Sequence, residues 1–254
     1  MGVWNWRKKN DDIILDCYTY NPYVYNFAKI NYGYHFLPEW WKRTPKNQGG
    51  DHETIKNCPA IVEYYKKSIV IPMWCEFEMV IEPKGNDKLF SWRSAQKDFQ
   101  VEQHPQDQFK EFAKQDGHDV KILSPWFIKC KENVDFTFTQ PVWSQRDSIF
   151  NLSLMPGVIN FKNQMQSNIN CFFQQVDTKQ VVHIEPLTPI AIMHPMSERK
   201  IKLRHHLLTS QDKDKTWGSL GHATNGLFFE EELFSKKKKN VFKKIDEIDG
   251  GVYK

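Results

Sequence analysis

Residues 136–139 read Phe136-Thr137-Phe138-Thr139, an alternation of aromatic rings with β-branched hydroxyl side chains. Successive side chains of a strand point to opposite faces, so this order predicts a strand with its rings on one buried face. The whole chain shares the bias, because aromatic residues make up 14% of its 254 residues. Large rings bury much apolar area and favour strands, so the sequence indicates a core built on sheets.

Further strands are expected on both sides of this stretch. Each is a short apolar or alternating run, and turn-forming residues separate it from the next. The expected strands cover residues 13–18, 69–81, 90–93, 120–123, 126–130, 134–139, 149–154, 168–173, 181–185, 190–194 and 200–208. Many short strands, with helices confined to the first half, predict a mainly β (α+β) fold with a β-sandwich or jelly-roll core.

Two short helices are expected within this core. The first covers residues 58–67, with Asn57 as its N-cap and Pro59 in its first turn, where a missing N–H costs little. The second covers residues 105–115, with a proline at its start and Gly117 after its end.

The chain divides into two parts of different character. Residues 1–210 are predicted to form one β-rich domain, because no internal repeat or Gly/Ser linker interrupts them. Residues 211–254 are predicted to be an extension, with a glycine-rich hinge followed by a basic, amphipathic C-terminal helix. This helix either packs on its own domain or docks on a partner, and a solvated tail is the third alternative. In the docking interpretation the partner-binding residues are Phe234, Val241, Ile245, Ile248, Lys236, Lys237, Lys238 and Lys239.

Composition excludes several classes of protein. Lys and Arg number 35 against 31 Asp and Glu, a net charge of +4, which is too small to indicate a nucleic acid or membrane partner. No apolar run approaches the length of about eighteen residues that a membrane span needs. The first ten residues have no apolar segment after their basic residues, so no secretory signal is expected. The five cysteines form no C-x-x-C pair, and they are expected to be reduced and buried, as in a reducing compartment.

Sequence motifs of catalysis and nucleotide binding are absent, and no cofactor is expected. One metal site can be constructed, from His183, Glu185 and His194. If the chain turns at residues 187–188, His183 pairs with Ile192 and lies diagonally beside His194 on one face. Two imidazoles and a carboxylate are the ligand set of non-haem iron oxygenases. The alternative interpretation is that these are surface or hydrogen-bonded side chains.

A basic strand is a further candidate for binding. Lys200, Lys202, Arg204 and His206 are expected to share one face of the last strand. That face is either solvated or a contact surface for an acidic partner or a phosphate backbone, in which case the protein is a single-stranded nucleic-acid binder.

The pair Trp40-Trp41 also has two interpretations. The two rings form a platform for a sugar or a base, or they plug the open end of a sheet.

Short motifs in one order along residues 1–210 are similar to a known family. They are a Trp-x-Trp start followed by basic residues, then Pro-Glu-Trp-Trp-Lys, Thr-Ile-Lys-Asn-Cys-Pro, Ile-Val-Ile-Pro-Met-Trp, Ser-Pro-Trp-Phe-Ile-Lys, Met-Pro-Gly-Val-Ile-Asn and Thr-Pro-Ile-Ala. The set resembles an uncharacterised protein family of tailed phages, chiefly those that infect marine cyanobacteria. The resemblance implies a phage origin and synthesis in the host cytoplasm, and it implies no activity and no catalytic residues.

Together these observations predict a non-catalytic phage structural or accessory protein. Its expected partners are phage or host proteins, including other virion subunits, and its expected place is the host cytoplasm or the virion. A jelly-roll iron oxygenase and a single-stranded nucleic-acid binder are the alternatives.

Overall fold

The computed structural model describes residues 12–47, 49, 53–85, 87–104, 118–144, 152–173 and 178–209. In this part the chain is mainly β with a few short helices, which confirms the mainly β (α+β) class that the sequence predicts. Its strands form four sheets, and of the strand pairs described only one is parallel.

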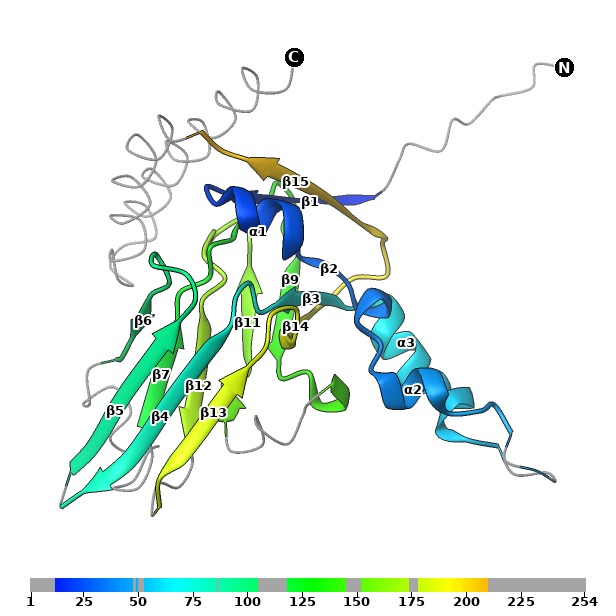
Figure 1. The fold of residues 1–254 in the computed structure, drawn as a ribbon. Helices are drawn as coiled ribbons and strands as arrows, with labels where there is room; N and C mark the ends of the chain where they lie inside the picture. The colour runs from blue at the N-terminus through cyan, green and yellow to red at the C-terminus, as the bar shows by residue number, and fades with distance from the viewer. Residues whose placement is uncertain are drawn as a thin grey trace, which may run out of the picture.

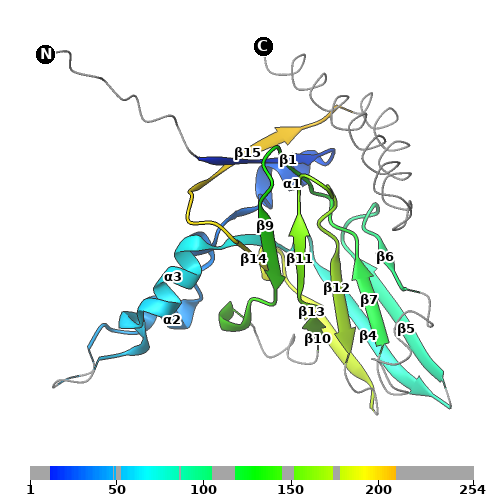
Figure 2. The same cartoon turned by 180° about the vertical axis from the view of Figure 1, so that it is seen from behind.

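One sheet, with the order β15-β1-β8, joins the two ends of the described chain. Its strands are β1 (Ile13–Thr19), β8 (Phe127–Cys130) and β15 (Ile201–Leu207). β1 and β15 run parallel with Ile13 opposite Ile201, whereas β1 and β8 are antiparallel. Figures 1 and 2 show β1 and β15 crossing the top of the molecule side by side.

The other three sheets are antiparallel throughout their described pairs. One has the order β11-β9-β14-β3-β2, with β2 (Asn31–Tyr32), β3 (Ile69–Pro72), β9 (Asp135–Thr139), β11 (Gly157–Asn160) and β14 (Pro189–Pro195). The next has the order β13-β4-β5, with β4 (Phe77–Lys84), β5 (Asp87–Ser94) and β13 (Gln180–Ile184). The last has the order β10-β12-β7-β6, with β6 (Val101–Glu102), β7 (His118–Ile122), β10 (Leu152–Leu154) and β12 (Ile169–Phe173).

A single apolar core receives side chains from all four sheets. Phe136 and Phe138 of β9 both belong to it, as their alternation with threonine predicts. The five cysteines are free thiols, and all except the half-buried Cys58 are buried, which confirms their expected role as small core residues. The sheets are therefore held together by one continuous packing of apolar side chains.

The helices are short and lie at the edges of this core. They are α1 (Pro22–Phe27), α2 (Glu39–Arg43) and α3 (Pro59–Lys67), with 3₁₀ turns η1 (Gly33–Phe36), η2 (Ile55–Asn57) and η3 (Val142–Ser144). In both views α2 and α3 project to one side of the sheets (Figures 1 and 2). None of the helices described is long and apolar enough to cross a bilayer.

α3 confirms the first expected helix, with Pro59 at its first position. The expected N-cap is wrong, because the cap residue is Cys58 and it makes no side-chain capping bond. Asn57 instead ends η2, and its side-chain amide donates a hydrogen bond to the carbonyl of Lys46.

The expected strand 69–81 is two strands in different sheets, β3 and β4. β3 ends at Pro72, which lies opposite Pro189 of β14. Neither proline has an N–H for the ladder, so the pairing stops there and the chain passes into the next sheet.

The second expected helix, at residues 105–115, and the extension 211–254 lie outside the described residues.

Candidate interaction surface

The three residues predicted to bind iron do not come together. His183 lies in β13, which pairs with β4, whereas His194 lies in β14, which pairs with β3 and β9. The expected pairing of His183 with Ile192 is therefore wrong. In the part of the chain that the structure describes, no group of three or more His, Cys, Asp or Glu side chains is placed to hold a metal ion.

The connection between β13 and β14 explains this separation. The backbone N–H of Leu187 donates to the carbonyl of Met73 at 2.8 Å, and the N–H of Met73 donates to the carbonyl of Thr188 at 2.8 Å. Met73 lies in the connection between β3 and β4. The connection from β3 to β4 and the connection from β13 to β14 are therefore hydrogen-bonded to each other. A hairpin at residues 187–188 would leave these backbone groups without partners.

Each predicted ligand has its own surroundings. The His183 side chain is 41% exposed, and its ring nitrogens lie 3.8 Å from a carboxylate oxygen of Glu76 and 3.9 Å from one of Glu78. His194 donates from Nε2 to the carbonyl of Tyr64 at 3.0 Å. Burial lowers the pKa of His194, and this hydrogen bond opposes the shift only in part. Glu185 is exposed just after β13. The hydrogen-bonded interpretation therefore holds for His194.

Two side chains of the predicted basic face of β15 bind a buried carboxylate. Arg204 and His206 lie on one face, as expected, because both bind Asp16 of β1, which is only 3% exposed. Arg204 donates from Nε and Nη2 at 2.7 and 2.8 Å, and His206 donates from Nε2 at 2.8 Å. Burial raises the pKa of Asp16, but these hydrogen bonds outweigh it and the pKa is lowered. Two of the predicted binding side chains thus support the sheet.

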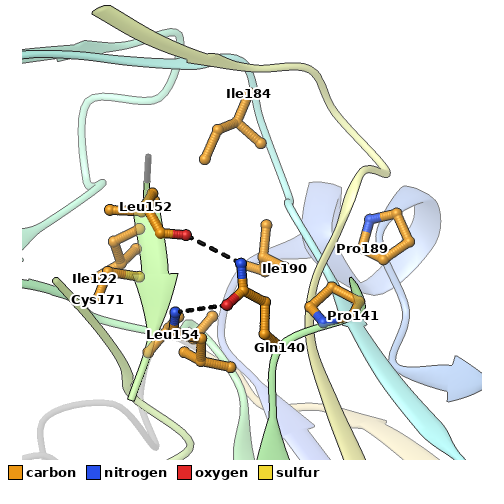
Figure 3. A pocket seen from close by; sticks show the side chains of 10 residues that line it. Ile122, Gln140, Pro141, Leu152, Leu154, Cys171, Ile184, Pro189 and Ile190 are labelled. Carbon is orange, nitrogen blue, oxygen red and sulfur yellow. Dashed lines mark hydrogen bonds between the residues drawn. The ribbon is translucent and has the colours of Figure 1, made fainter. Parts of the chain in front are cut away.

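A small cavity lies among strands β7, β10, β12, β13 and β14, which belong to three of the sheets. It has a volume of about 20 Å³, which is room for one water molecule, so it takes no substrate-sized ligand. Its one polar side chain is Gln140, which donates to the carbonyl of Leu152 at 3.1 Å and accepts from the N–H of Leu154 at 3.4 Å (Figure 3). Gln140 therefore caps the edge of β10 that pairs with no other described strand, as a further strand would. The lining residues are Ile122, Gln140, Pro141, Leu152, Leu154, Ile169, Cys171, Ile184, Pro189 and Ile190.

The Trp40-Trp41 pair is divided between the inside and the outside of the molecule. Trp41 is 6% exposed and packs with Ile61 and Tyr65 of α3 in a small cluster of its own. Trp40 is 40% exposed. Adjacent positions on a helix point about 100° apart, so α2 directs the Trp41 ring toward α3 and leaves the Trp40 ring at the surface.

Trp40 is joined to a second exposed tryptophan. Its Nε1 donates to the backbone carbonyl of Trp143 in η3 at 3.0 Å, and the two ring centroids lie 6.4 Å apart with an interplanar angle of 49°. Trp143 is 37% exposed and its neighbour Val142 is 63% exposed. We call Trp40, Val142 and Trp143 the aromatic surface. The sequence shows no sign of it, since 103 positions separate the two tryptophans.

Cationic side chains lie on α2, the helix that carries Trp40, and in the segment that contacts its end. Lys42 pairs with Glu39 at 2.6 Å, and Lys56 donates to the carbonyls of Lys42 and Thr44. Arg43 is exposed and has no ion pair in the described part of the chain. It follows Trp40 by three positions on α2, so the two side chains lie on the same side of the helix.

No protein-family model and no curated protein matches this chain.

Proposed function

We propose that this chain is a non-catalytic phage structural or accessory protein that binds a phage or host protein, such as a virion subunit, through the aromatic surface. The observation that carries the proposal is the contact of two exposed tryptophans, Trp40 and Trp143, from distant parts of the chain. Exposed apolar groups that lie together mark binding sites more often than scattered ones do.

The geometry of the surface suits a protein partner. Tryptophan and arginine are enriched among the residues that contribute most to binding between proteins, and Trp40 and Arg43 lie one helical turn apart. The hydrogen bond from Trp40 to the Trp143 carbonyl holds one ring in place before a partner arrives. Less side-chain freedom is then lost on binding, which favours affinity.

The proposal includes two finer predictions about the rest of the chain. The sheets β13-β4-β5 and β10-β12-β7-β6 would be part of a jelly-roll core. The extension 211–254 would provide a second contact through its predicted apolar stripe and lysines, Phe234, Val241, Ile245, Ile248 and Lys236 to Lys239. The iron-oxygenase alternative is not carried forward, because its three ligands lie in separate surroundings.

Photocrosslinking in the infected host tests the proposal. Benzoylphenylalanine is placed at position 40, and at position 89 as the control, since Leu89 is equally exposed on β5 at the other side of the molecule (Figure 1). We expect one defined phage or host protein to be crosslinked from position 40 only, and the product to weaken when Arg43→Ala is added. Equal products from both positions, or none from position 40, would contradict the proposal.

A single-stranded nucleic acid is the second candidate partner, because bases stack on exposed aromatic rings beside cations. Titration of a labelled oligonucleotide with wild-type protein and Trp40→Ala, at two salt concentrations, tests it. Binding that weakens with salt and with the substitution supports this candidate, and absent binding removes it.

A further inference from the structure

The aromatic surface is small and is built from two short helical elements. Trp40 of α2 is 40% exposed, and Val142 and Trp143 of η3 are 63% and 37% exposed. Three side chains give room for only one or two anchoring groups of a partner. An amphipathic helix docks with several anchors spread over two turns, which requires a longer apolar groove. The surface therefore does not suit a helical partner.

The backbone of the same elements does not offer a strand edge. The N–H of Thr44, at the end of α2, donates to the carbonyl of Trp40 at 3.0 Å, and the N–H of Val142 donates to the carbonyl of Gln140 at 2.9 Å. A partner strand needs a row of unpaired N–H and C=O groups along an extended segment. Binding here therefore depends on side chains and on single hydrogen bonds.

The aromatic surface keeps one side-chain donor for a partner. The Nε1 of Trp40 already donates to the carbonyl of Trp143. The Nε1 of Trp143 donates to no group in the part of the chain that the structure describes. A polyproline II segment has no internal hydrogen bonds, so its backbone carbonyls can accept from such a donor. Segments of this kind bind to exposed aromatic rings in several peptide-recognition domains.

The charge at the end of α2 indicates the sign of the partner. Arg43 and Lys46 are exposed and form no ion pair among the described residues. Lys56 brings a third cation, whose Nζ donates to the Thr44 carbonyl at 3.0 Å. Arg43 follows Trp40 by three positions, which places it on the same side of the helix. Charge complementarity therefore favours an acidic group beside the aromatic surface.

We propose that the protein partner bound under the proposed function, on which this inference rests, contacts the aromatic surface through an extended segment with proline and a nearby acidic residue. The proline ring packs on the rings of Trp40 and Trp143, a backbone carbonyl accepts from the Trp143 indole, and the carboxylate pairs with Arg43. A polyproline II segment is extended before it binds, so little backbone freedom is lost.

Selection from a yeast-displayed library of random peptides tests this chemistry with the purified full chain. We expect the selected peptides to contain proline with Asp or Glu within a few positions. Arg43→Glu reverses the charge beside Trp40, so it should select proline with Lys or Arg instead. Lys97→Glu makes the same change of charge at an exposed position after β5, and it should leave the acidic preference intact.

Trp143→Phe separates the hydrogen bond from the ring contact, because phenylalanine keeps an aromatic ring without an N–H. We expect the affinity for a peptide selected on the wild type to fall about fivefold, the contribution of one hydrogen bond. Replacing the proline of that peptide by alanine should weaken its binding to the wild type about tenfold. Isothermal titration calorimetry measures both changes, and unchanged affinities would contradict the two contacts.

Three results of the selection would overturn the inference. They are selected peptides without proline, no selection above the background of Trp40→Ala, and an acidic preference that persists in Arg43→Glu. The photocrosslink from position 40 is independent of them, because it captures the partner whatever the sequence of its contact segment. A crosslinked partner with any of these results leaves the proposed function in place and removes only the segment, whereas a missing crosslink contradicts both.

Discussion

The carboxylate of Asp16 in β1 accepts two hydrogen bonds from the guanidinium of Arg204 in β15, although 188 positions separate the two residues. The pair connects the first and last strands of the described chain through a parallel pairing. A two-point contact between planar groups fixes the register of the two strands as well as holding them together.

Replacing Asp16 should therefore destabilise the protein. Asp16→Asn removes the charge that Arg204 and His206 share, and we expect the free energy of unfolding to fall by about 1–3 kcal/mol. The Arg204 side chain is half exposed, which places the effect toward the lower end. Urea denaturation measures it. Glu39→Gln, in an exposed ion pair, is the control and should change little; equal stabilities of Asp16→Asn and wild type would contradict the prediction.

Stability should also fall in mild acid through His194. Its pKa is lowered by burial in the folded state, so the unfolded chain binds the proton more readily. The stability is therefore full above the ordinary histidine pKa of 6.5 and is lost as the pH falls through the lowered pKa of the folded state. Denaturation midpoints between pH 7.5 and pH 5 should decrease in the wild type and decrease less in His194→Gln. If the midpoint depends on pH equally in both proteins, the loss of stability in acid comes from groups other than His194.

Gln140→Leu tests the cap on the β10 edge. The leucine has a similar size but leaves the carbonyl of Leu152 and the N–H of Leu154 without their side-chain partner. We expect a loss of about 2 kcal/mol of unfolding free energy, since unpaired backbone groups near the core are costly. Gln100→Leu, at an exposed position, is the matched control. Thermal unfolding of the two variants compares them, and equal midpoints would mean that water replaces the amide.

Gly33 is required by a close approach of two chain segments. A Cβ at this position would lie 1.9 Å from the Ser68 hydroxyl oxygen and 2.7 Å from the Tyr65 carbonyl oxygen. Gly33→Ala should destabilise the protein by about 1–3 kcal/mol, because the carbonyl belongs to the backbone of α3 and moves little. Gly157→Ala, whose Cβ meets nothing within 4 Å, should leave the stability nearly unchanged. Denaturant titration measures the unfolding free energy of both variants. An unchanged stability of Gly33→Ala would contradict the prediction and show that η1 shifts easily.

The neighbouring tryptophans should differ in what they contribute. Trp41→Ala removes the largest side chain of the cluster with Ile61 and Tyr65, so we expect a loss of about 3 kcal/mol. Trp40→Ala should change stability much less, because Trp40 is 40% exposed whereas Trp41 is 6% exposed. Thermal unfolding followed by circular dichroism compares the two. A larger loss of stability in Trp40→Ala than in Trp41→Ala would mean that the Trp40 ring stabilises the fold and is not a binding group.

The features that depend on near neighbours in the chain were predictable. The alternation at residues 136–139 predicts β9 and the inward direction of its rings, and Pro59 predicts the first turn of α3. α1 was missed although its signal is local, since Asn21 caps it and a proline follows. These features follow from backbone geometry, which a few consecutive residues determine.

Pairing between distant segments was not predictable. The sequence by itself determined the strand periodicity and the apolar character of the core, because both arise within a few residues. The tertiary structure alone decided that β13 and β14 lie in different sheets, that Asp16 meets Arg204, and that Trp40 meets Trp143. Periodicity shows which face of a strand is buried, whereas the partner of that strand depends on how all the apolar faces pack together at once.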